Sequence, residues 1–298
     1  MTFEELEVLR KKAKNNIIYG IIITIIVCIL FVVIFKTTKF LFFVAFTGGV
    51  IIYFVSMPSR DDFKNAFKEM FVLKSLKEIF TDLVYEPNRG IDYSVIANTE
   101  MMKMGDRYTS NDYVCGKYKN INVMQSDVHI EEKHETTDSD GNRHENWVTI
   151  FKGRWMIFDF NKMFKANIQV CQKGFGNAKV KNWGNELKYK RVKMEDEAFN
   201  DIYKIYAQSE HEAFYILTPS LMEKFKRIDE LVKGKLLFCF VNNKLHVGIQ
   251  NNKDSFEHSI FKKMDEQKIL DEISKEIKLI TNFVDELDLD NDLFRREV

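Results

Sequence analysis

Histidine and carboxylate residues are concentrated in one short stretch of the sequence. His129, Glu131, Glu132 and His134 lie close together, and His144 follows ten residues later. Imidazole combined with carboxylate is a typical ligand set for zinc. Strand alternation places His129 with Glu131 on one face and Glu132 with His134 on the other, while His134 and His144 could approach each other across a turn. The three histidines are therefore weak candidates for a metal site, and a solvated hairpin is the interpretation that we favour, because no known ligand spacing is matched.

No recognised catalytic signature accompanies these residues. The sequence lacks G-x-S-x-G, H-E-x-x-H and G-x-x-x-x-G-K-[ST], which mark common hydrolase, metalloprotease and nucleotide-binding sites. We therefore predict no catalytic residue and no cofactor, and we favour a binding or scaffold protein over an enzyme. The alternative is a metal-dependent hydrolase tethered to the inner membrane, which would use the hairpin between His129 and His144.

A basic stretch follows in the second half of the chain. Residues 179–193 are rich in lysine and arginine, with Trp183 and Tyr189 interleaved. For a domain next to a membrane, anionic lipid is a more economical partner than RNA. A solvated strand and loop is the alternative that we favour. The candidate contacts to lipid or to a partner protein are Lys179, Lys181, Lys188, Lys190 and Arg191.

The charge balance argues against a nucleic-acid partner. The chain has 44 basic and 44 acidic residues. Its first 59 residues hold six basic and three acidic residues, so the remainder carries a net charge of −3. Proteins that bind nucleic acids usually show a clear basic excess, so we predict no nucleic-acid partner.

The elements that must position these residues begin with two apolar runs, Ile17 to Phe35 and Phe40 to Met57. Neither run contains a charged residue, and only four residues separate them. A helix needs about 17–25 apolar residues to cross a bilayer, whereas the apolar part of a signal peptide is about 7–15 residues long. We therefore predict a transmembrane hairpin with helices over 17–35 and 40–57, within an N-terminal segment at residues 1–58.

The charges that flank the hairpin predict its orientation. Basic residues are concentrated outside the hairpin at Arg10, Lys11, Lys12, Lys14, Arg60, Lys64 and Lys68, and only Lys36 and Lys39 lie between the helices. Because cytoplasmic flanks carry the lysine and arginine excess, we expect an inner-membrane protein with both termini in the cytoplasm. Four cysteines without a C-x-x-C spacing agree with a reducing compartment. Residues 3–14 either lie on the inner leaflet or extend the first helix.

The rest of the chain predicts an α+β domain over residues 59–262, with a mostly antiparallel sheet and flanking helices. Apolar residues at intervals of three and four predict a helix over Arg60–Val84, and a shorter one is expected over Asp92–Met104. Short β-like runs follow, with a long hairpin turning at residues 136–142. Further strands are expected at residues 167–171 and 188–193, a helix near 210–217 after a lead-in at 198–205, a helix opened by Thr218-Pro219, and a second hairpin over residues 235–249.

The C-terminal segment, residues 263–298, contains a last helix from about Met264 to Leu287 and an acidic tail. Its apolar residues form a seam with heptad-like spacing. We favour packing of this seam on its own domain. The alternative is self-association or binding of a partner helix through the same seam.

Several short motifs are similar to those of one protein family. They are Asp106-Arg107-Tyr108, Asp112-Tyr113-Val114-Cys115-Gly116, Phe151-Lys152-Gly153, Asp159-Phe160-Asn161-Lys162-Met163-Phe164, Ala213-Phe214-Tyr215-Ile216-Leu217-Thr218-Pro219 and Phe256-Glu257. In this order they resemble the bacterial membrane-anchored family known as domain of unknown function 3137, over roughly residues 60–262. The resemblance implies a bacterial inner-membrane protein with a cytosolic α+β domain. It implies no activity and assigns no functional residue.

Overall fold

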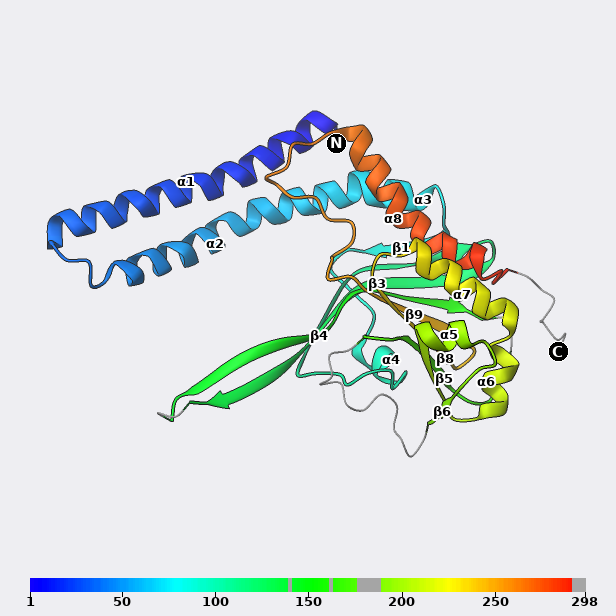
Figure 1. Cartoon of the computed structure of the whole chain (residues 1–298). Helices are drawn as coiled ribbons and strands as arrows, with labels where there is room; N and C mark the ends of the chain where they lie inside the picture. The colour runs from blue at the N-terminus through cyan, green and yellow to red at the C-terminus, as the bar shows by residue number, and fades with distance from the viewer. Residues whose placement is uncertain (139–140, 161–162, 176–188, 291–298) are drawn as a thin grey trace. The chain divides into compact units, whose positions relative to one another are not determined.

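The computed structural model describes residues 1–138, 141–160, 163–175 and 189–290 (Figure 1). The chain divides into two compact units. The first, here called the hairpin unit, comprises Met1–Ser75 and Phe256–Ser274. The second, here called the sheet unit, comprises Leu76–Ser255 and Lys275–Val298. The chain therefore leaves the sheet unit after Ser255 and re-enters it at Lys275.

Two long helices dominate the hairpin unit: α1 (Phe3–Phe35) and α2 (Leu41–Phe67). A capping box starts α1, because Thr2 Oγ1 accepts a hydrogen bond from the Glu5 N–H group and the Glu5 carboxylate accepts one from Thr2 N–H. The helix ends at Lys36, which has a left-handed backbone conformation (φ 50°). Residues 3–14 therefore extend the first helix, which is one of the two alternatives that the sequence left open.

Two glycines allow α1 and α2 to approach closely. A Cβ atom at Gly20 would lie 2.7 Å from Ile52 Cγ1, and one at Gly48 would lie 2.4 Å from Thr24 Cγ2. Small residues at such positions let helix backbones pack tightly where no hydrophobic effect drives association, as in lipid. The two apolar helices therefore form a packed pair.

The chain after α2 differs from the helix predicted over Arg60–Val84. α2 continues into η1, a π-helical segment at Lys68–Leu73, and then into α3 at Lys74–Lys77. Strand β1 follows at Thr81–Glu86 and pairs with strand β2. The end of the helix prediction is wrong because the β-prone residues Val84 and Tyr85 pair with another strand, which overrides their helical spacing.

The helix expected over Asp92–Met104 is shorter in the structure. α4 covers only Tyr93–Ala97. The Thr99 hydroxyl donates to the Ile96 carbonyl oxygen (2.6 Å) and accepts from the Met101 N–H group (3.3 Å). Such local bonds from a threonine side chain offer the backbone an alternative to the helix, which explains the early end.

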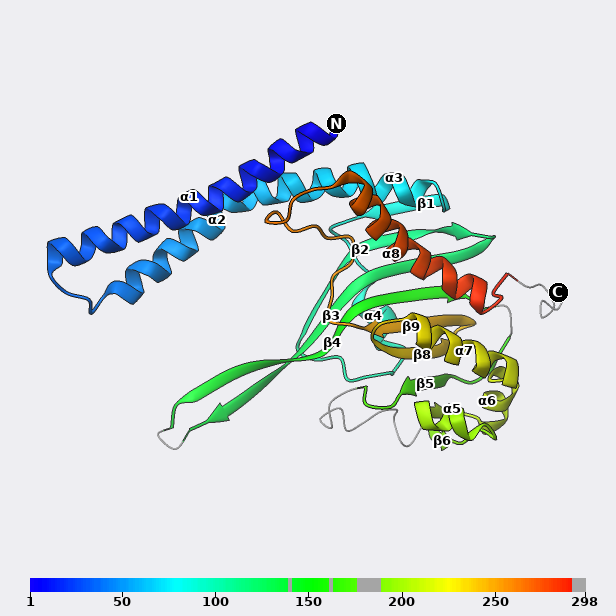
Figure 2. The ribbon, with the colours of Figure 1, turned by 45° about the horizontal axis from the view of Figure 1, so that its top comes forward.

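Within the described residues, nine strands form one sheet with the order β1-β2-β3-β4-β9-β8-β5-β7-β6 (Figure 2). Every neighbouring pair is antiparallel. The predicted α+β class with an antiparallel sheet is confirmed. The remaining strands are β2 (Arg107–Tyr118), β3 (Ile121–Thr137), β4 (Arg143–Asp159), β5 (Ile168–Gln172), β6 (Lys190–Val192), β7 (Tyr203–Ala207), β8 (Lys235–Val241) and β9 (Lys244–Gln250).

Strands β3 and β4 extend beyond the rest of the sheet as a two-stranded ribbon (Figure 1). Pairing of β2 with β3 reaches only Glu131, and pairing of β9 with β4 begins only at Gly153. Thr137 lies opposite Arg143 at the end of the ribbon, so the chain turns where the sequence predicted a hairpin.

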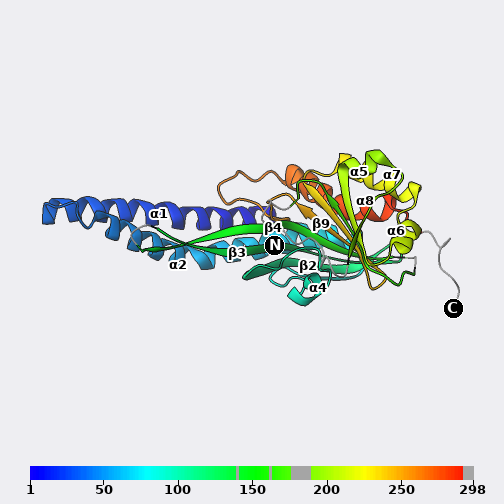
Figure 3. The same cartoon turned by 60° about the horizontal axis from the view of Figure 1, so that its bottom comes forward.

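Helices lie on both faces of the sheet unit (Figure 3). α4 is on one face, above a buried cluster that includes Phe151 and Trp155. The opposite face carries α7, in which Phe225 stacks on Phe238 of β8 with 3.9 Å between ring centroids. The helices not yet given bounds are α5 (Glu197–Ile202), α6 (Glu210–Ile216), α7 (Pro219–Leu231) and α8 (Glu266–Glu286).

Local sequence signals succeed for α7 and fail for β7. Thr218 Oγ1 accepts a hydrogen bond from the Leu221 N–H group (3.3 Å), and Pro219 occupies the first turn of α7, as predicted. Residues 198–205, in contrast, are not a simple lead-in to the next helix. They form α5 and the start of β7, which lies between β5 and β6.

The apolar seam of α8 is buried in the single chain. Within the sheet unit, Ile277, Ile280 and Val284 are fully buried, and Phe283 packs against Phe158 of β4 with 6.0 Å between ring centroids. This agrees with packing of the seam on its own domain. Self-association or binding of a partner helix through the seam, the alternative, stays a prediction.

Candidate functional site

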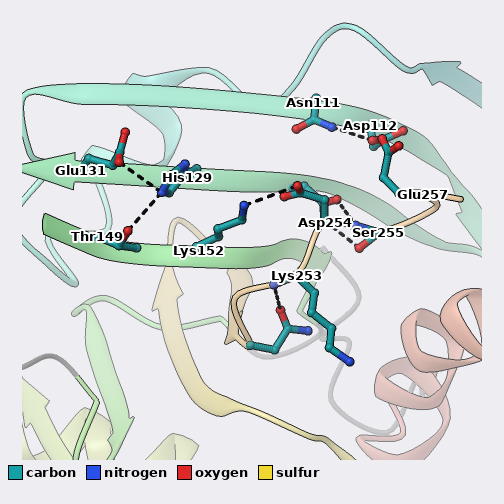
Figure 4. A network of polar contacts seen from close by, with 12 residues as sticks. Asn111, Asp112, His129, Glu131, Thr149, Lys152, Lys253, Asp254, Ser255 and Glu257 are labelled. Carbon is teal, nitrogen blue, oxygen red and sulfur yellow. Dashed lines mark hydrogen bonds and ion pairs between the residues drawn. The ribbon is translucent and has the colours of Figure 1, made fainter. Parts of the chain in front are cut away.

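The structure places the three histidines of the ribbon beside three different carboxylates. His129 Nε2 lies 3.7 Å from Glu131 Oε1 and 3.3 Å from Thr149 Oγ1 (Figure 4). His134 Nε2 lies 3.3 Å from Glu132 Oε2, and His144 Nε2 lies 3.1 Å from an Asp138 carboxylate oxygen. The two faces predicted by strand alternation agree with these pairs.

The histidines do not converge on one point. His129 pairs across the ribbon with Lys152, His134 with Asn146, and His144 with Thr136. No three histidine, cysteine, aspartate or glutamate side chains within the described ranges form a cluster that could hold a metal ion. The geometry brings each histidine to one neighbouring carboxylate, as expected for a solvated ribbon.

The basic stretch is only partly described. Lys179, Lys181 and Lys188 lie outside the described residues. Lys190 and Arg191 belong to β6, the last strand in the sheet order, and both are exposed. Because successive strand residues point to opposite faces, these two side chains cannot contact the same ligand on one face.

Arg191 lines a polar hollow of about 490 Å3 in the sheet unit, here called the basic hollow. Three other cations share its wall: Lys173 after β5, Lys193 after β6, and Lys204 in β7. Sequence reasoning identified only Arg191, because the other three come together through the pairing of β5, β7 and β6. The carboxylates that line the same hollow are those of Glu195, Glu197 and Asp201.

In the hairpin unit, basic residues beside the apolar helices hold a distant chain segment. Arg10 is buried and donates to the carbonyl oxygens of Ile260 (2.7 Å) and Lys262 (2.9 Å). From α2 and η1, Lys64 and Lys68 both place Nζ 2.9 Å from Glu257 Oε1. Segment 256–262 is thus bonded to both helices at their charged ends.

A buried arginine performs a similar role in the sheet unit. Arg154 of β4 donates from Nε to Ser255 Oγ (2.9 Å). It also donates from Nη1 to the Glu276 carbonyl oxygen (2.7 Å) and from Nη2 to Glu276 Oε2 (3.2 Å). Ser255 is the last residue before the chain leaves the unit, and Glu276 is the second residue after it returns. The Arg154 guanidinium therefore binds the chain just before and just after residues 256–274, which belong to the hairpin unit.

Asp127 completes this group, here called the Arg154 cluster (Asp127, Arg154, Ser255 and Glu276). The carboxylate of Asp127 accepts hydrogen bonds from both the N–H group and the hydroxyl of Ser255, the latter at 2.7 Å. Asp127 and Arg154 are almost completely buried. Burial raises the pKa of Asp127 to about 6, although the nearby positive charge of Arg154 acts in the opposite direction.

This raised pKa predicts a specific pH dependence. The pKa of Asp127 is about 6 in the folded chain and near its ordinary value of 3.8 when unfolded, so protonation favours the folded state. Its contribution is fully present below pH ~4 and is lost as the pH rises through about 6. Since one pKa unit equals about 1.4 kcal/mol, we expect wild type to gain up to about 3 kcal/mol relative to Asp127→Asn between pH 7 and pH 4.

The measurement is the difference between the unfolding free energies of wild type and Asp127→Asn, in denaturant titrations at several pH values. Taking a difference removes the opposing contribution of the buried His246, whose pKa is lowered to about 4 by burial. That histidine stabilises the fold above pH ~6.5 and loses this effect as the pH falls through about 4. A difference that does not change with pH would contradict the buried, proton-binding state of Asp127.

Comparisons with known proteins relate part of the chain to a family. Residues 149–289 match the family model "Protein of unknown function (DUF3137)". No curated protein matches the chain. A solved structure, that of the mycobacterial trehalose monomycolate transport factor A, TtfA, is similar with a TM-score of 0.42 and 11% identity, covering 79% of this chain and 97% of that one. A likeness this low carries no argument about function.

The matched segment runs from β4 through α8. It contains Phe151-Lys152-Gly153 and Phe256-Glu257, two of the motifs that carried the resemblance, and it contains Arg154, Ser255 and Glu276. The motifs at residues 106–108 and 112–116 precede it. The match over residues 149–289 supports the family of proteins of unknown function that the sequence motifs predicted.

Proposed function

We propose that this chain is a membrane-anchored binding or scaffold protein whose sheet unit meets its partner at the cytoplasmic surface of the inner membrane. The observation that most directly supports this proposal is the exposure of the two apolar helices. Both helices are long and apolar enough to cross a membrane, and almost none of the residues in their most apolar parts are buried. The core helices of a soluble protein would be covered by other protein groups, so lipid is the environment that fits these helices.

Charge supports the proposed orientation. Lys12, Lys14 and Arg60 lie at the ends of the helices remote from the loop, and the loop itself carries only Lys36 and Lys39. By the positive-inside rule, this distribution supports a cytoplasmic location for both termini and for the sheet unit. The cysteines at 28, 115, 171 and 239 are all free, which fits a reducing compartment.

A binding role is favoured over catalysis by how the buried polar groups are used. Arg154 and Asp127 hold segments of the same chain together and do not face a shared reaction centre. The candidate histidines His129, His134 and His144 each contact one neighbouring carboxylate, and His144 is the most exposed of them. Among the described residues, no observation favours the hydrolase alternative.

The test is site-specific photocrosslinking of the full chain in native bacterial membranes. A photoreactive amino acid is placed at Thr137 near the end of the ribbon, at Lys204 in the basic hollow, or at Thr38 in the hairpin loop as the control on the other side of the membrane. We expect discrete light-dependent adducts from one or both sheet-unit positions and a different pattern from Thr38. An adduct of twice the chain mass would identify a second copy as the partner. Absence of any adduct from the sheet unit would contradict the proposed binding role.

A further inference from the structure

Cations gather on one face of the sheet where β8, β5, β7 and β6 lie side by side. Lys204 of β7 lies opposite Cys171 of β5, so both point to the same face. The register of β6 with β7 ends with Val192 opposite Ile205, so Lys193 and Lys204 are the next residues along the two chains, and both line the basic hollow. Like charges held close together in a sheet repel each other and destabilise it.

The same arrangement recurs one strand away. The register of β5 with β8 pairs Cys171 with Leu237, and its continuation sets Lys173 opposite Lys235. Lys235 Nζ lies 3.4 Å from the Lys173 carbonyl oxygen, which confirms that the two residues are neighbours. Two pairs of neighbouring lysines therefore lie next to each other, and Arg191 is on the same face by strand alternation.

Few carboxylates neutralise this face. Lys173 pairs with Asp201, with 3.3 Å between Nζ and Oδ1, and this aspartate is largely exposed. Among the described residues, Arg191, Lys193 and Lys204 have no ion-pair partner within 4 Å. Glu195 and Glu197 also line the basic hollow, and among the described residues neither forms an ion pair with these cations. The fold thus holds several positive charges close together, open to solvent and largely unpaired.

We propose that the basic hollow is a binding site for a phosphate group, held by Arg191, Lys193 and Lys204. A phosphate carries several acceptor oxygens, and an arginine with two lysines can supply charge-assisted hydrogen bonds to all of them. The volume of about 490 Å3 is in the range of ligand pockets and exceeds what a single ion requires. Bound phosphate would also relieve the repulsion between Lys193 and Lys204. The inference rests on the proposed binding role of the sheet unit but not on the membrane anchor.

The phosphate could belong to an anionic lipid headgroup or to a soluble phosphate ester, and the experiment separates these sources. Full-length protein in a non-ionic detergent is titrated with glycerol 3-phosphate by calorimetry. In parallel, the protein in nanodiscs of phosphatidylcholine, with and without phosphatidylglycerol, is analysed by native mass spectrometry for retained lipid. The test variant is Lys193→Gln/Lys204→Gln. The matched control, Lys233→Gln/Lys253→Gln, removes two exposed lysines of the same unit outside the hollow.

We expect wild type to bind the soluble ester or to retain phosphatidylglycerol, and the test variant to do so about tenfold or more weakly, which corresponds to about 1.4 kcal/mol. The control should bind as wild type does. The test variant should unfold at the same temperature as wild type or higher, because a repulsive pair is removed, which separates loss of binding from loss of fold. Binding in neither arm, or equal weakening in the control, would overturn the proposal. Because the detergent arm needs no membrane insertion, failure of the anchor would leave this result unaffected.

Discussion

Replacing Arg154 with methionine is expected to lower the free energy of unfolding of the sheet unit by about 3–5 kcal/mol. The change removes three hydrogen bonds, two of them to Glu276, and it leaves Asp127 buried without its neighbouring positive charge. An uncompensated buried charge costs far more than the net contribution of the pair. Guanidinium titration of full-length protein in detergent, followed by near-ultraviolet circular dichroism, measures the loss.

Two further variants make this prediction specific. Arg227→Met removes an exposed arginine of α7 that lies 3.5 Å from Glu286, and we expect a change below about 1 kcal/mol. Asp127→Asn combined with Arg154→Met should be less damaging than the sum of the single changes, because the buried negative charge is removed as well. If Arg154→Met lowered the free energy of unfolding no more than Arg227→Met does, the role of Arg154 in holding Ser255 and Glu276 would be contradicted.

The same substitution should act on the chain between the two connections. Ser255 and Glu276 lie on either side of the excursion into the hairpin unit, and Arg154 bonds to both. Loss of those bonds would release the chain at Ser255 and at Glu276, on either side of residues 256–274. Arg10 would still hold residues 260 and 262 within the hairpin unit. We therefore expect faster amide exchange near Ser255 and Glu276 than at Ile260.

Placing aspartate in the middle of both apolar helices is expected to release the protein from the membrane. Ile26 of α1 and Ile51 of α2 are at least half exposed, so neither supports a protein core. An aspartate at the centre of a membrane helix costs about 3 kcal/mol on insertion scales, and the Ile26→Asp/Ile51→Asp double variant pays this cost in both helices. The measurement is the fraction of full-length chain that stays in the membrane pellet after an alkaline wash.

The control for this experiment is Ile26→Leu/Ile51→Leu, which keeps both helices apolar and should stay in the pellet. The aspartate variant should appear in the soluble or aggregated fraction, while the sheet unit keeps its tryptophan circular-dichroism signal. Equal retention of both variants after the wash would show that these helices do not hold the protein in lipid.

Much of the architecture was predictable because it rests on local patterns. The apolar runs, the capping pair Thr218-Pro219 and the two hairpins each depend on residues close in sequence. The failures have two causes. β1 and β7 are short strands stabilised by pairing with distant strands, which helical spacing cannot predict. α4 ends early because the Thr99 side chain bonds to the backbone beside it.

The candidate sites were less predictable because their residues are far apart in the sequence. Arg154 contacts residues 101 and 122 positions away, and Asp127 contacts a residue 128 positions away. Lys193 and Lys204 become neighbours only once β6 and β7 pair. Two family motifs were available signals, because Phe151-Lys152-Gly153 directly precedes Arg154 and Phe256-Glu257 directly follows Ser255. Glu257 also binds Lys64 and Lys68.

Accessibility of single cysteines tests most directly whether the hairpin crosses the membrane twice with the sheet unit inside. Thr38 in the loop and Thr137 in the ribbon are both exposed. Each is replaced by cysteine, one at a time, in a full chain whose own four free cysteines have been replaced by serine. Intact spheroplasts are then treated with a maleimide that cannot cross membranes. We predict that the cysteine at 38 is labelled from outside and that the cysteine at 137 is labelled only after lysis. Labelling at 137 in intact spheroplasts, with protection at 38, would contradict the account.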